Sequence, residues 1–112
     1  MIVVKKTMLP IKRSRVVIAK SNDLFVIEVS IEQTDDFDKY PPDGIKATFR
    51  ILKSSGGVEE NELVVLIDNH KPFDYHEHDK LPEEHNSRKR IGANNWQEAW
   101  QLFDLKVKEV IK

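Results

Sequence analysis

The sequence predicts an α+β fold: an antiparallel meander sheet of four to five strands with a C-terminal helix packed on one face. Two observations support this prediction. Apolar and polar residues alternate along much of the first two thirds of the chain, as in strands with one buried face. The final segment instead repeats its apolar residues with the period of a helix. With 112 residues, we expect a single domain, residues 1–112, around one core.

The first two strands are predicted to form a hairpin. Residues 16–20 are an apolar run, residues 21–23 have the composition of a turn, and residues 24–32 alternate between apolar and polar. Because alternate side chains of a strand point to the same face, one set is expected to be buried. This set comprises Phe25, Ile27, Val29 and Ile31.

The middle of the chain predicts two further strands. Residues 34–44 are acidic and include two adjacent prolines, so we expect an exposed loop. Alternation resumes over residues 45–51, and a turn at residues 54–57 leads into the apolar run 63–67. That run is typical of a strand covered on both faces. The inward set of the first of these strands is Ile45, Ala47, Phe49 and Ile51.

The last strand and the helix follow. Residues 73–78 predict a strand after a turn, and residues 79–93 a loop in which residues 88–91 are an optional edge strand. Asn95 has the spacing of a helix N-cap, with Glu98 three residues later. The apolar stripe that follows is expected to pack on the sheet, with a face shared with a partner chain as the rarer alternative. It consists of Trp96, Ala99, Trp100, Phe103, Val107 and Val110.

Composition narrows the class of protein. The chain has no cysteine, which excludes disulfides and thiolate metal sites. No apolar run approaches the roughly 20 residues needed to span a bilayer. The apolar start of the chain is too short for a signal peptide. We therefore expect a cytoplasmic protein that does not associate with membranes.

The net charge of −1 conceals a segregation of charge along the chain. Residues 1–20 carry six basic side chains and no acidic one, whereas residues 21–44 carry seven acids and one lysine. One interpretation is a basic arm for nucleic acid. The more common one is that neighbouring strands neutralise each other across a hairpin. The overall balance does not favour strong non-specific DNA binding.

Three of the four histidines lie within residues 68–78, directly after an apolar run. His76 and His78 are two positions apart, so in an extended backbone they share a face, with their attachment points roughly 6 to 7 Å apart. This separation suits two functions. The pair could hold one metal ion, or it could place a base and an acid on opposite sides of a phosphate.

As metal ligands, the two imidazoles would form a chelate that one further side chain completes. The candidates for that position are His70, Asp68 and Asp74. Glu77 faces the other way in an extended strand and cannot join them. With only histidine and carboxylate donors, the candidate ions are Zn²⁺ and Mn²⁺.

As general acid and base, His76 and His78 would need no cofactor. One imidazole would take the proton of a ribose 2′-hydroxyl and the other would protonate the departing 5′-oxygen. Arg88 and Arg90 could stabilise the phosphate if the chain folds back. The plainer alternative is that these histidines are solvated and paired with nearby carboxylates, with no further role.

The order of these features resembles the TumE-type toxin family of toxin–antitoxin systems. The resemblance extends loosely from about Arg13 to the terminal helix, and it is specific at Asp68-Asn69 and at His76-Glu77-His78. Relatives usually have glycines between these two motifs, where this chain has none. The resemblance implies an RNA-directed toxin that is neutralised by a helix-turn-helix antitoxin protein.

The leading hypothesis is thus a toxin-like component of a toxin–antitoxin pair, acting as a metal-independent endoribonuclease with His76 and His78 as catalytic residues. Two alternatives remain open. One is a non-catalytic protein-interaction module, for example a homodimer, and the other is a histidine-ligated, metal-dependent hydrolase. The residues expected to bind substrate are Arg88, Arg90, Asp68, Asn69 and His70.

Overall fold

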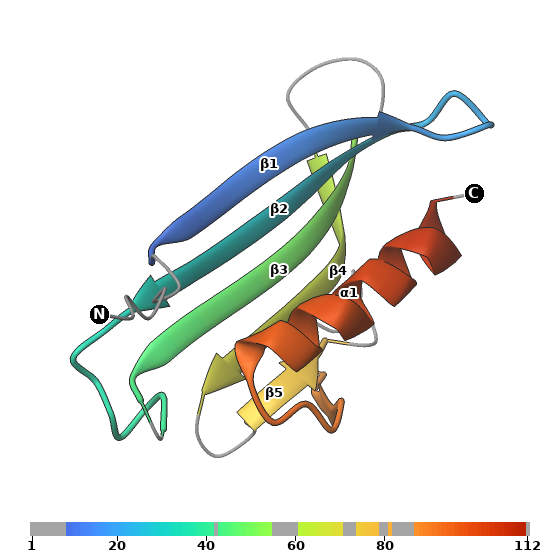
Figure 1. The fold of residues 1–112 in the computed structure, drawn as a ribbon. Coiled ribbons are helices and arrows are strands. Elements are labelled where there is room, and N and C mark those ends of the chain that lie inside the picture. The colour runs from blue at the N-terminus through green and yellow to red at the C-terminus, as the bar shows by residue number, and fades with distance from the viewer. Residues whose placement is uncertain are drawn as a thin grey trace, which may run out of the picture.

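The computed structural model describes residues 9–41, 43–54, 61–70, 74–78, 81 and 87–111. In this part of the chain, six strands form one antiparallel sheet in sequence order, and one helix lies across a face of the sheet (Figure 1). The α+β class and the meander are therefore confirmed. No helix among the described residues is long and apolar enough to cross a membrane.

The elements are β1 (Ile11–Ile18), β2 (Leu24–Gln33), β3 (Ile45–Ser54), β4 (Asn61–His70), β5 (Asp74–Glu77), β6 (Lys89–Arg90) and α1 (Trp96–Val110). The predicted count of four to five strands is wrong, because the two-residue β6 pairs with β5 as a sixth strand. The first strand also begins earlier than the predicted residues 16–20. Its polar half pairs with β2 as far as Ile11, which lies opposite Ile31.

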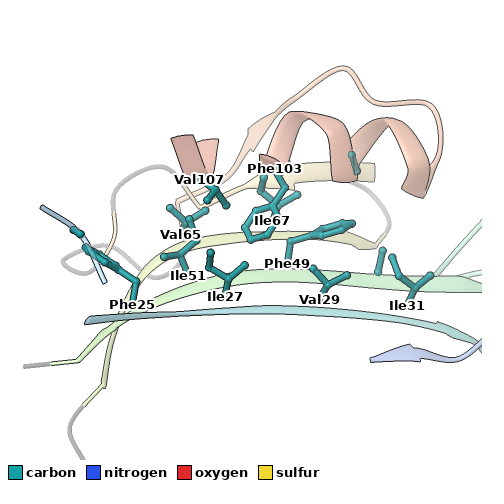
Figure 2. Packing of buried hydrophobic residues seen from close by; sticks show 13 residues of the cluster. Phe25, Ile27, Val29, Ile31, Phe49, Ile51, Val65, Ile67, Phe103 and Val107 are labelled. Carbon is teal, nitrogen blue, oxygen red and sulfur yellow. The ribbon is translucent and has the colours of Figure 1, made fainter. Parts of the chain in front are cut away.

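The alternation predicted for β2 and β3 is confirmed by their burial. Figure 2 shows side chains of β2, β3 and β4 pointing toward α1, which covers them. Phe49 lies at the centre, with its ring 5.3 Å from that of Phe103 and 6.2 Å from that of Trp100. The buried apolar side chains of the three strands are Phe25, Ile27, Val29, Ile31, Ala47, Phe49, Ile51, Val65 and Ile67.

The strand β4 is covered less completely than its apolar sequence predicts. Val65 and Ile67 are buried on the face that packs against α1. Their neighbours Leu63, Val64 and Leu66 are only half-buried. The expectation of a strand covered on both faces is thus wrong, because the single helix packs on one face of the sheet.

The helix begins where its capping sequence predicts. The side chain of Asn95 accepts a hydrogen bond of 2.8 Å from the backbone N–H of Glu98. The carboxylate of Glu98 reaches back and accepts from the N–H of Asn94 at 3.2 Å. These two bonds satisfy donors that the first turn of a helix otherwise leaves exposed.

Candidate metal centre

The hairpin of β4 and β5 brings Asp68 and the two histidines together. Asp68 lies directly opposite His76 in the pairing of these strands. The backbone N–H of His78 continues the pairing by donating to the carbonyl of Leu66 at 2.9 Å. Side chains of directly paired residues project from the same face of a sheet. Asp68, His76 and His78 therefore share one face.

That face is the one opposite to the helix. Glu77, between the two histidines, points to the other side and forms an ion pair of 3.3 Å with Lys106 of α1. The prediction that Glu77 faces away from the two histidines is therefore confirmed. The lysine partner also shows that α1 and the histidines lie on different sides of β5.

One ligand atom from each of Asp68, His76 and His78 converges on a common point, and all three atoms lie within 4.8 Å of one another. We call these residues the Asp-His-His cluster. Oδ1 of Asp68 is in direct contact with Nε2 of His76 and lies 3.6 Å from Nε2 of His78. The rings of the two histidines are 5.1 Å apart at an angle of 49°.

The Asp-His-His cluster is buried although it faces away from the helix. The side chains of His76 and His78 are 0% and 7% exposed. The three converging atoms are shielded from solvent. Burial of polar atoms is costly unless a proton or a cation compensates them. This arrangement therefore calls for positive charge between the three atoms.

The orientation of the His76 ring is fixed by its other nitrogen, Nδ1, which does not face Asp68. Nδ1 lies 2.9 Å from the backbone carbonyl oxygen of Asp74. A carbonyl oxygen can only accept, so we assign the proton to Nδ1. Nε2 then directs its lone pair toward the carboxylate of Asp68, unless a second proton makes the ring cationic. Metal-binding histidines commonly make such a hydrogen bond with their other nitrogen.

The charge state of Asp68 fits the same picture. Burial raises the pKa of this carboxyl group. The hydrogen bond and the charge of His76, together with the charges of His78 and His70, lower the pKa by a larger amount. The net result is a pKa below the ordinary value for aspartate. Asp68 is consequently ionised at neutral pH and available as an anionic ligand.

His70 connects the Asp-His-His cluster to a cavity. Its ring lies edge-on against that of His76, with the ring centres 4.8 Å apart. His70 and the paired Asp74 line a cavity of about 310 Å³ at the end of the hairpin, together with Lys39 and Tyr75. Burial, followed by the negative charge of Asp43, raises the pKa of Tyr75 to about 12. Its hydroxyl therefore stays protonated at neutral pH.

Asn69, which was expected to bind substrate, makes specific contacts within the sheet. Its buried side chain accepts a hydrogen bond from the N–H of Ala47 and donates one to the carbonyl of Ile45, each 2.8 Å long. The backbone pairing of β3 with β4 ends at Thr48 and Asp68. The amide of Asn69 thus continues this pairing beyond its last backbone partners.

The two arginines expected to contact a phosphate lie beside β5. Arg90 is opposite His76 in the pairing of β5 with β6, so the chain does fold back at this point. Arg88 precedes β6, and both side chains are exposed. His85, the fourth histidine, lies outside the described residues.

Comparisons with known proteins identify no family for the chain. No family model, no curated protein and no solved structure matches it. The resemblance to TumE-type toxins therefore stays a prediction, together with the antitoxin partner and the RNA substrate that it implies. The candidate function rests on the geometry of the Asp-His-His cluster.

Proposed function

We propose that this protein binds a divalent transition-metal ion, with Zn²⁺ as the best match, through the Asp-His-His cluster, and that the bound ion supports a hydrolytic reaction. The observation that carries this proposal is the convergence of three buried ligand atoms from Asp68, His76 and His78. It corresponds to the metal-dependent alternative that the sequence left open.

The residues fit Zn²⁺ in chemistry and in spacing. Zinc binds imidazole nitrogen and carboxylate oxygen at about 2.0–2.2 Å, so two ligand atoms of a tetrahedral site lie about 3.4 Å apart. The separation of 3.6 Å between Asp68 Oδ1 and His78 Nε2 is close to this value. An ion bound between the three atoms would replace the contact between Asp68 and His76. Mn²⁺ fits less well, since it prefers octahedral sites rich in oxygen.

Three protein ligands are also the number that catalytic zinc sites use. Such sites leave the fourth position to a water molecule, whose pKa the ion lowers to about 7. The adjoining cavity supplies space for a substrate, and His70 stands between that cavity and the Asp-His-His cluster. Asp74 and Lys39 offer a carboxylate and a cation on its wall. These features favour hydrolysis as the class of reaction.

Burial favours metal binding over acid–base catalysis by the same histidines. A general acid or base must come within hydrogen-bonding reach of its substrate, roughly 2.6–3.2 Å. His76 is fully buried and His78 is 7% exposed, so a ribose or phosphate group has little access to either ring. The side chains that hold a metal ion need no such access, because the substrate would meet the ion at its fourth position and not the imidazole rings.

The proposal is tested by titrating the purified protein with Zn²⁺ in a calorimeter. The unsubstituted protein is expected to bind one ion, and His76→Ala and His78→Ala are each expected to weaken binding by a factor on the order of 100. The matched control is Glu77→Gln, because Glu77 lies between the two histidines but faces the helix. It is expected to bind Zn²⁺ like the unsubstituted protein. Stoichiometric binding that survives both histidine substitutions would contradict the proposal.

The reaction class has a separate readout. The zinc-loaded protein is expected to hydrolyse bis(p-nitrophenyl) phosphate, and a chelator is expected to stop the reaction. Zinc binding without any hydrolysis would restrict the proposal to a structural ion. Cleavage of an RNA oligonucleotide that persists in excess chelator would instead support the metal-independent ribonuclease.

A further inference from the structure

The outer edge of β1 lies on the opposite side of the sheet from the hairpin of β4 and β5 (Figure 1). β1 is 8 residues long and pairs with β2 along its whole length. Among the described residues, no strand pairs with its other edge. The N–H and C=O groups of such an edge form a template for an additional strand.

A groove accompanies this edge on the helix side. It has a volume of about 530 Å³ and lies between β1 and α1. Its apolar floor includes Ile27 and Phe103, and Asp104 also lines it. The guanidinium group of Arg13 lies 5.6 Å from the centre of the Trp100 ring, at the range of a cation–π contact. The groove therefore combines apolar surface with positive charge.

The cations of β1 are available to a partner. Lys12, Arg13 and Arg15 are exposed and line the groove. Within the described part of the chain, none of the three forms an ion pair. The adjacent acid Glu28 of β2 pairs with Arg50 of β3, at 3.4 Å. Among the described residues, the neutralisation expected across the hairpin of β1 and β2 is not seen, and Glu28 is paired with β3 instead.

The opposite side of the same edge begins with the polar residues Lys12 and Ser14 and ends with two apolar residues, Val16 and Ile18. Val16 and Ile18 are 60% and 66% exposed. They alternate with Arg13 and Arg15 along β1, so they project from the face away from the helix. A strand lying beside β1 would meet Arg13 and Arg15 on the helix side, and Val16 and Ile18 at one end of the other side.

We propose that the outer edge of β1 binds an extended segment of a partner protein, which adds to the sheet as a further strand and alternates acidic with apolar residues. Its acidic side chains lie over Arg13 and Arg15, and its apolar side chains lie against Val16 and Ile18. The backbone bonds provide affinity and the alternation provides specificity, as in other cases of strand addition. This binding is independent of the Asp-His-His cluster.

Other occupants fit the edge less well. Two copies of β1 side by side would bring their exposed cations together, and like charges on neighbouring strands are destabilising. Single-stranded RNA would stack its bases on exposed aromatic rings. The guanidinium group of Arg13 already lies over the Trp100 ring, where a base would have to stack. The net charge of −1 also disfavours a polyanion of high charge density.

The test uses a fluorescent peptide with the length of β1 that alternates Glu and Val, and follows its anisotropy during titration with the protein. We expect saturable binding that weakens at high salt. A Lys–Val peptide of equal length is expected to bind at least about 10-fold more weakly, because its charges repel those of β1. A Glu–Val peptide with prolines at alternate positions is expected not to bind, because it cannot form the backbone ladder.

Charge reversal locates the site. The double variant Arg13→Glu/Arg15→Glu changes exposed side chains and is expected to remain folded. It is expected no longer to bind the Glu–Val peptide and to bind the Lys–Val peptide instead. Lys108→Glu, an exposed position on α1, is the control and is expected to bind like the unsubstituted protein. The proposal is overturned if the Glu–Val peptide does not bind, if charge reversal has no effect, or if the proline-containing peptide binds equally well. Dimerisation of the protein through β1, or tighter binding of oligouridine at these residues, would also overturn it.

Discussion

His76 is held at both nitrogens of its ring. Nδ1 is fixed by the carbonyl of Asp74, and Nε2 faces the carboxylate of Asp68. The edge of the His70 ring packs against it from the side. A ligand whose orientation is set in this way loses little conformational entropy when an ion binds. With its proton assigned to Nδ1, His76 has the tautomer that coordination through Nε2 requires.

Asn69 holds β3 to β4 next to this site, and its removal is expected to destabilise the fold. Asn69→Ala leaves the N–H of Ala47 and the carbonyl of Ile45 without their side-chain partner. Each unsatisfied buried group costs about 1–3 kcal/mol, so for the two groups we expect a loss of about 2–6 kcal/mol in the free energy of unfolding. Urea denaturation measures this loss.

The control for that substitution is Gln97→Ala, which truncates an exposed amide at the start of α1. It is expected to change the free energy of unfolding by no more than about 0.5 kcal/mol. Equal losses for the two variants would show that the bonds of Asn69 to β3 do not stabilise the sheet.

At the scale of elements, α1 supplies much of the cover for the sheet. Phe103 is fully buried and stacks on Phe49 of β3. Phe103→Ala is expected to cost about 3–5 kcal/mol, since it removes a large buried side chain and leaves a cavity. Leu105→Ala is the matched control, because Leu105 lies on the same helix but is 61% exposed.

Thermal unfolding followed by circular dichroism distinguishes these two helix variants. We expect a large decrease in the melting temperature for Phe103→Ala and almost none for Leu105→Ala. If both substitutions lowered it equally, the packing of α1 through its Phe103 face would be refuted.

The elements differ in how well the sequence predicts them. The helix and the strands β2 and β3 are long and buried on one face, so their periodicity is strong and their inward residues were correctly assigned. The edge strands β1 and β6 lack such a periodicity. The polar half of β1 and both residues of β6 are exposed, and only pairing with a neighbouring strand makes them extended. Hydrophobic periodicity cannot reveal such pairing.

The candidate site was predicted in part. The spacing of His76 and His78 was enough to place both on one face, opposite to Glu77. The choice of Asp68 among three candidate ligands required the register of β4 against β5. The burial of this face also could not be predicted, because polar residues normally mark the solvent side of a strand.

At the scale of the whole molecule, the two faces of the sheet and its edge at β1 have different roles. One face forms the core with α1 (Figure 2), the other face carries the Asp-His-His cluster, and the edge at β1 is open to a further strand. Because Asp68 belongs to β4, while His76 lies in β5 and His78 directly follows β5, a bound ion would join neighbouring segments of the sheet. Metal binding is therefore expected to stabilise the fold by mass action.

The most direct test of the metal centre is an anomalous difference map from crystals grown with Zn²⁺ and measured at the zinc absorption edge. Our account predicts one strong peak at about 2.0–2.2 Å from Asp68 Oδ1 and from the Nε2 atoms of His76 and His78. A map without density between these three atoms, with His76 instead donating a regular hydrogen bond to Asp68, would contradict it.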